Sequence, residues 1–144
     1  MAIYASKQDL LDRDEGFVWN TALDRSTNTL SDTAIDQCLE QADEEINSFL
    51  SRRFVLPLVT VPGLLNKLAI VITFYWLADR DNQVTELLDK RYRDALATLR
   101  EIVDNKRDLG LPTLETPAEG ATGKVTLVQE GERLFSRQKL SGVL

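Results

Sequence analysis

The sequence at residues 62–77, PGLLNKLAIVITFYWL, decides the fold. Pro62 suits the first position of a helix, because the amide hydrogen that proline lacks would have no partner there. In a helix that begins at Pro62, apolar side chains cover most of the surface: Leu64, Leu65, Leu68, Ala69, Ile70, Val71, Ile72, Phe74, Tyr75, Trp76 and Leu77. A helix that is apolar on all sides has to be covered. We expect either the central helix of the domain or a helix that also packs on a neighbouring subunit, and the sequence is compatible with both.

An amphipathic helix is predicted upstream of this stretch. It begins after Ser31 or Asp32 as the cap and stops around residues 52–54, before an extended connector that contains Pro57. One apolar stripe has helical spacing: Ile35, Cys38, Leu39, Ala42, Ile46, Phe49 and Leu50. The outer face is expected to be acidic, with Asp36, Glu40, Asp43 and Glu44.

Two further helices are predicted. Downstream, the apolar spacing favours an amphipathic helix from about Gln83 to Lys106. Near the start of the chain, residues 6–15 favour a short helix that Ser6 caps and Gly16 ends. The polar stretch at residues 21–29 is expected to be a loop.

The character of the chain changes at Leu111. Prolines and glycines interrupt residues 112–123, which reads as a linker, and residues 124–136 could form two short strands around a turn. The predicted fold class is therefore mainly α, a compact bundle of about four helices with a C-terminal extended arm or β-hairpin. The predicted boundaries are a helical domain at 1–110 and a linker and arm at 111–144.

The composition excludes several classes of protein. A net charge of −6 over 144 residues argues against tight general binding of DNA phosphates. No apolar run reaches the roughly 20 residues that a membrane span needs, and the first residues lack the pattern of a secretion signal. We expect a protein that folds in the cytoplasm without contacting a membrane. The single Cys38 agrees, since it has no intrachain disulfide partner.

The charge is unevenly distributed along the chain. Residues 1–51 hold eleven acids against three bases, whereas the last fourteen residues hold Arg133, Arg137 and Lys139 against Glu132 alone. The two ends are therefore electrostatically complementary. This pattern is compatible with a tail that meets an acidic face of a neighbour, and also with a solvated acidic helix followed by an unstructured end.

Enzymatic chemistry is not expected. The chain has no histidine, which removes the commonest general base and the usual partner of a nucleophile. Cys38 falls on the predicted buried face of an acidic helix, where burial and nearby carboxylates would suppress the thiolate. Neither a pocket signature nor a glycine-rich phosphate loop accompanies the carboxylates. We expect no catalytic residues and no cofactor.

One stretch partly matches a calcium loop. At alternating positions stand Asp24, Ser26, Asn28, Leu30 and Asp32, as the oxygen ligands of a calcium loop would. However, Thr29 stands where such a loop needs glycine, and Ile35 stands where a glutamate should close the site. We expect a hydrogen-bonded loop rather than a metal site.

Several segments, in this order, resemble the small head-to-tail connector proteins of Mu-like tailed bacteriophages and prophages. The most specific is residues 44–58, EEINSFLSRRFVLPL, where an acidic helix runs into Arg-aromatic-x-Leu-Pro-Leu. Around it stand Tyr4-Ala5, Val61-Pro62, residues 91–96 (RYRDAL) and residues 133–137 (RLFSR). The resemblance covers nearly the whole chain. Phe49, Phe54 and Asn47 depart mildly from the residues that relatives tend to show.

The resemblance implies a non-enzymatic protein of the virion neck. Such a protein would form a homo-oligomeric ring, probably of twelve copies, between the portal and a tail or stopper protein. The ring would extend the channel through which genomic DNA passes without specific binding.

Two sets of residues are predicted to make these contacts. Portal or partner binding is assigned to the C-terminal arm, with Phe135 and Leu140 as apolar anchors and with Arg133, Arg137 and Lys139 meeting carboxylates. The subunit interface is assigned to the apolar helix, at Leu64, Phe74 and Trp76. An alternative function is a stand-alone acidic regulatory module that binds a basic partner through the face from Asp32 to Glu45.

Overall fold

Four helices and one short hairpin make up the regular structure of residues 2–114, the part of the chain that the computed structural model describes. In chain order the elements are α1 (Lys7–Thr21), β1 (Leu23–Asp24), β2 (Thr29–Leu30), α2 (Asp32–Leu50), α3 (Gly63–Arg80) and α4 (Glu86–Val103). The mainly helical class is confirmed. The predicted C-terminal arm, with its possible hairpin, lies outside the described residues.

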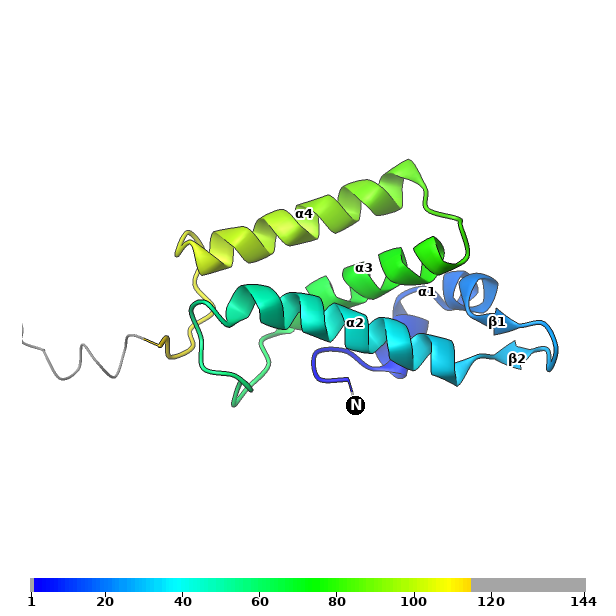
Figure 1. Cartoon of the computed structure of the whole chain (residues 1–144), viewed down its shortest axis with the longest axis horizontal. Coiled ribbons are helices and arrows are strands. Elements are labelled where there is room, and N and C mark those ends of the chain that lie inside the picture. Colours follow the sequence, from blue (N-terminus) through cyan, green and yellow to red (C-terminus); the bar gives the residue numbers. More distant parts are fainter. Residues whose placement is uncertain (1, 115–144) are drawn as a thin grey trace, which may run out of the picture. The chain divides into compact units, whose positions relative to one another are not determined.

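Helix α3 contacts each of the other three helices, and Figure 1 shows the axes of α2, α3 and α4 roughly aligned, with α3 antiparallel to the other two. Most of its apolar side chains are buried: Leu65, Leu68, Ala69, Ile70, Ile72, Phe74, Leu77 and Ala78. The apolar stretch at residues 62–77 thus belongs to the central helix, which was one of the two expectations. Pro62 is its N-cap rather than its first residue, which still spares the helix an unpaired amide.

Helix α2 follows the prediction closely, with one exception. Ser31 caps it by accepting a hydrogen bond from the amide of Ala34, and the predicted stripe is buried except for the half-buried Phe49. Asp43, however, was placed on the acidic outer face and is in fact buried, with 5% of its surface exposed. Its carboxylate accepts hydrogen bonds from the amides of Ile3 (2.6 Å) and Tyr4 (3.2 Å).

The expectation that Gly16 ends the first helix is wrong. The helical path breaks at Asp14, with φ −161° and ψ 86°, and then resumes to Thr21. The Asp14 carboxylate accepts the amide of Phe17 at 3.0 Å, as an N-cap does, so it starts the second segment. That segment brings Phe17 against Phe74 of α3, with ring centroids 4.8 Å apart.

The expected loop at residues 21–29 contains the strand β1 and the start of β2, and the two strands pair Leu23 with Leu30. Within the turn, the amide and hydroxyl of Ser26 donate to the Asp24 carboxylate, and these hydrogen bonds lower the pKa of that carboxyl group. Asn28 takes the left-handed conformation with φ 57°. The local turn chemistry was therefore predicted, whereas the strand pairing was not.

Helix α4 is shorter than the predicted 83–106. Thr85 caps it by accepting from the amide of Leu88 at 3.2 Å, and it ends at Val103. Ala95, Leu99 and Ile102 are its buried residues.

Contacts divide the chain into two units. All the helices belong to the first, which contains residues 1–52 and 56–109. The second contains Arg53–Val55 and residues from Gly110 onward. In its described part, Phe54 bridges to Thr113, and the amide of Leu114 donates to the carbonyl of Arg53 at 2.8 Å.

Candidate functional site

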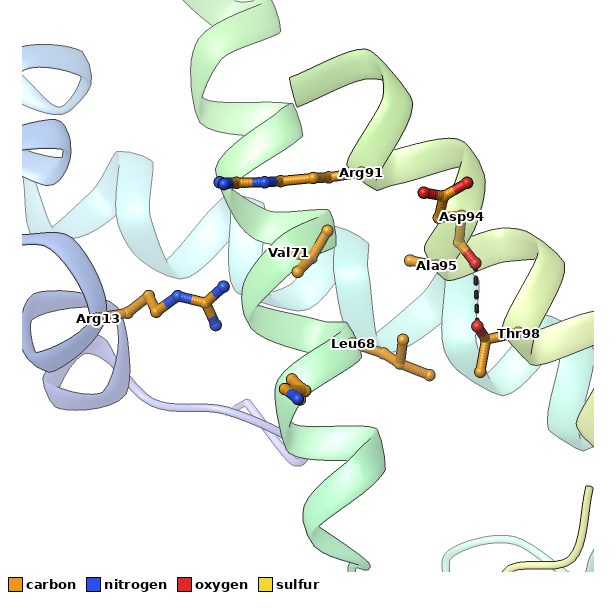
Figure 2. A pocket seen from close by; sticks show the side chains of 8 residues that line it. Arg13, Leu68, Val71, Arg91, Asp94, Ala95 and Thr98 are labelled. Atoms are coloured by element: carbon orange, nitrogen blue, oxygen red, sulfur yellow. Dashed lines mark hydrogen bonds between the residues drawn. The ribbon is translucent and has the colours of Figure 1, made fainter. Parts of the chain in front are cut away.

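An open groove of about 220 Å³ lies on the helical unit, where α1, α3 and α4 meet (Figure 2). Its lining comes from all three helices: Arg13 of α1, Lys67, Leu68 and Val71 of α3, and Arg91, Asp94, Ala95 and Thr98 of α4. The groove exists because α1 and α4 both pack on α3 and leave a strip of it between them. Val71, in the middle of that strip, remains only half-buried.

The groove combines an apolar floor with basic sides. Figure 2 shows Arg13 and Arg91 extending toward α3 from the two flanking helices. In residues 2–114, neither these two arginines nor Lys67 forms an ion pair or a side-chain hydrogen bond. Asp94, the one acid of the lining, pairs with Lys90 at 2.9 Å. The groove therefore presents three uncompensated cations in a chain whose net charge is −6.

The opposite charge lies on α2, which has six acids and no base. Three of these acids face inward or are paired. Asp32 pairs with Lys7, Asp43 holds the N-terminal amides, and Glu45 accepts hydrogen bonds from two aromatic side chains. The other three, Asp36, Glu40 and Glu44, are exposed and spaced four residues apart. They form an acidic stripe along the outside of α2.

Glu45 connects three helices. It accepts from the indole nitrogen of Trp76 on α3 at 3.2 Å and from the hydroxyl of Tyr92 on α4 at 2.6 Å. The Tyr92 ring also stacks on Tyr75, with centroids 4.0 Å apart. Burial, together with the neighbouring Glu45 carboxylate, raises the pKa of Tyr92, which therefore stays a hydrogen-bond donor.

The three residues predicted for the subunit interface differ in how deeply they are buried. Leu64 and Trp76 are half-buried, and Trp76 is already engaged with Glu45. Phe74 is 7% exposed and packs on Phe17, so it has little surface left for a neighbour. The predicted partner-binding residues of the arm, 133–140, lie outside the described residues.

The groove could not be predicted from the sequence. The one available signal was Lys67, the only charged residue in an otherwise apolar stretch. Arg13 and Arg91 have the pattern of ordinary surface positions, because nothing in the sequence shows that helices as far apart in the chain as α1 and α4 flank the same strip of α3.

Residues 2–114 contain no group of three potential metal-ligating side chains. Cys38 is buried as predicted, and burial raises the pKa of its thiol. Each helix in this part of the chain is too short or too polar to cross a bilayer.

Comparisons with known proteins agree on one family. The sequence-family model described as "Bacteriophage Mu, Gp36" matches residues 4–127. The chain is 33% identical over 108 residues to gene product J of Escherichia phage Mu, covering 75% of this chain and 74% of that protein. It is 28% identical over 149 aligned positions to the Mu-like prophage FluMu protein gp36 of Haemophilus influenzae, covering 100% of both chains. The family match includes all four helices and the groove.

Proposed function

Because the chain belongs to the bacteriophage Mu Gp36 family, we propose that it is a structural, non-enzymatic protein of the phage neck. In this proposal, copies of the chain form a ring that joins the capsid portal to the tail or to the next neck protein. The ring extends the DNA channel, and twelve copies are expected from the resemblance to connector proteins.

The observation that carries the proposal is the uncovered strip of α3. A closed ring requires head-to-tail contacts, in which one face of a subunit meets a different face of the next. The central helix of a self-sufficient monomer would be covered on all sides. Here Val71 and Leu64 are only half-buried, and the groove beside Val71 has an apolar floor. Such a surface supports a role in which a neighbouring subunit covers the open strip of α3.

The charge of the chain suits a DNA channel. The net charge of −6 weakens any hold on DNA phosphates, so the genome would remain free to move past the ring.

The segment from residue 111 onward supplies the proposed contact with the portal. Phe135 and Leu140 would be its apolar anchors, and Arg133, Arg137 and Lys139 would meet carboxylates of the portal. One arm alone would bind weakly, because ordering it costs free energy. Several arms on one ring would bind together through their high effective concentration.

The test is assembly with the portal protein encoded in the same phage genome, followed by native mass spectrometry and electron microscopy. We expect a ring of this chain on the portal. A truncation after Gly120 should keep the helical circular dichroism spectrum of the full chain and lose portal binding. Full binding by the truncated chain would contradict the role of the arm.

A double variant refines this test. Phe135→Ala with Arg137→Ala should weaken portal binding while the melting temperature stays within about one degree, because these side chains are proposed to contact the portal and not the core of the chain. Gln129→Ala with Ser141→Ala, on the same arm, is the matched control and should bind normally. If the chain stays monomeric, does not bind the portal and binds a basic protein, the result would instead support the alternative function, an acidic regulatory module.

A further inference from the structure

We infer that the groove between α1, α3 and α4 receives the acidic stripe of α2, residues Asp36, Glu40 and Glu44, from a second copy of the chain. This inference rests on the proposed ring and names the two surfaces that meet in it.

The charges of the two surfaces are complementary. Arg13, Lys67 and Arg91 converge on one apolar floor with no ion pair among residues 2–114. An anionic partner that covers the floor would compensate these cations in a partly dehydrated site, where ion pairs are stronger than at an open surface.

The acidic stripe lacks compensation on its own helix. Like charges four residues apart destabilise a helix, and α2 has no lysine or arginine that could offset them. Asp36 and Glu44 also form no ion pair within the described residues. Docking into a basic groove would therefore relieve repulsion within α2 as well as within the groove.

The dimensions agree. At 1.5 Å per residue, the stripe from Asp36 to Glu44 is about 12 Å long. The α4 side of the groove, from Arg91 to Thr98, is about 10 Å long by the same measure. Two exposed side chains lie between the acids of the stripe, Gln37 and Gln41. Both are uncharged, so they do not repel the cations of the groove.

The two surfaces lie on opposite sides of the helical unit, as a ring requires. Lys67 and Trp76 are nine residues apart on α3, which at 3.6 residues per turn places them half a turn from each other. Trp76 contacts Glu45 of α2, whereas Lys67 lines the groove. Figure 2 accordingly shows α2 behind α3, away from the labelled side chains. Each subunit can therefore receive one neighbour and insert into another, which is a head-to-tail contact.

The last fourteen residues of the chain fit the groove less well. They carry three bases and one acid, the same sign of charge as the groove. An acidic helix face is the better electrostatic match among the surfaces of this chain.

Charge reversal with complementation tests the inference. One variant reverses the groove (Arg13→Glu with Arg91→Glu), and a second reverses the stripe (Asp36→Lys with Glu44→Lys). Alone, each would place like charges in contact, so we expect subunit association at least about 100-fold weaker than in the unmodified chain. Mixed in equal amounts, the two variants should assemble again with alternating subunits, because every contact then joins opposite charges.

The matched control reverses two exposed arginines elsewhere, Arg25→Glu with Arg52→Glu, and should assemble like the unmodified chain. Native mass spectrometry with and without portal gives the composition, and circular dichroism confirms folding. Rings formed by either reversed variant alone, or no recovery on mixing, would overturn the inference while the proposed ring stands. If the unmodified chain forms no ring under either condition, both the ring and this contact are refuted.

Discussion

Helical spacing alone gives the wrong environment for Asp43. Its spacing puts it beside Glu40 and Glu44, yet it is buried and receives the amides of Ile3 and Tyr4. Asn66 of α3 completes the arrangement by donating to the carbonyl of Tyr4 at 2.8 Å. These hydrogen bonds attach the N-terminal segment to the helices.

Asp43→Ala should destabilise the folded chain. It leaves the buried amide of Tyr4 without an acceptor, which costs about 1–3 kcal/mol. Urea denaturation measures the change in the free energy of unfolding. Asp36→Ala on the exposed stripe is the control and should change that free energy by less than about 0.5 kcal/mol. Equal effects would place Asp43 on the surface, as the sequence pattern had suggested.

Asp43 should also make the stability of the folded chain depend on pH. Burial raises the pKa of this carboxyl group above its ordinary value of 3.8, although the two amides oppose the shift. The folded state then binds a proton more tightly than the unfolded state, so this group's contribution to stability falls as pH rises from 3.8 through the raised pKa. The stability of the unmodified chain minus that of Asp43→Asn should decline over this window and be constant above it. A difference that rises with pH would contradict the assigned environment.

Among the elements, two side chains determine how the helices begin and connect. Asp14 restarts α1 after a break, which places Gly16 inside a helical segment rather than at its end. Glu45 joins α2 to α3 and α4 through Trp76 and Tyr92.

Gly16→Ala should stabilise the chain by about 0.5–1 kcal/mol, because alanine has the better helix propensity and a stiffer unfolded chain. A Cβ at this position would meet Asp14 Oδ1 at 3.7 Å, an ordinary contact. Thermal and urea denaturation would both report the gain. A loss of stability would instead indicate the helix end that the sequence suggested.

Glu45→Ala and its neighbour Glu44→Ala form a matched pair. Removing Glu45 leaves the Trp76 and Tyr92 donors without their acceptor, for a loss of about 2 kcal/mol in the free energy of unfolding. Glu44 is exposed and should matter little to the monomer. If the two substitutions were equally mild, Glu45 would not connect the helices.

At the scale of the whole molecule, the distribution of charge governs association. The groove is basic and the stripe is acidic, so their attraction is screened by salt. Raising sodium chloride from about 0.1 M to about 0.5 M shortens the Debye length by about half and should weaken subunit association at least about tenfold. Analytical ultracentrifugation measures the association. Association that is insensitive to salt would indicate a contact made by apolar surface alone.

Much of the fold was predictable because it depends on local chemistry. Ser31 caps α2 with its own hydroxyl, and the period of the apolar residues identifies two of the helices, α2 and α4. The apolar stretch at residues 62–77 predicted the central helix, because apolar side chains are more stable when they are buried away from water. The mainly helical class and the family follow from the same segments.

The positions of Asp43, the break at Asp14 and the groove could be decided only by the tertiary structure. Each depends on residues far apart in the chain: Asp43 on the N-terminal amides, the second half of α1 on Phe74, and the groove on Arg13 and Arg91 meeting across α3. Sequence periodicity identifies which side of a helix is apolar, because that is a property of the helix itself. Which neighbour covers that side, and which strip stays open, is determined by how the helices pack.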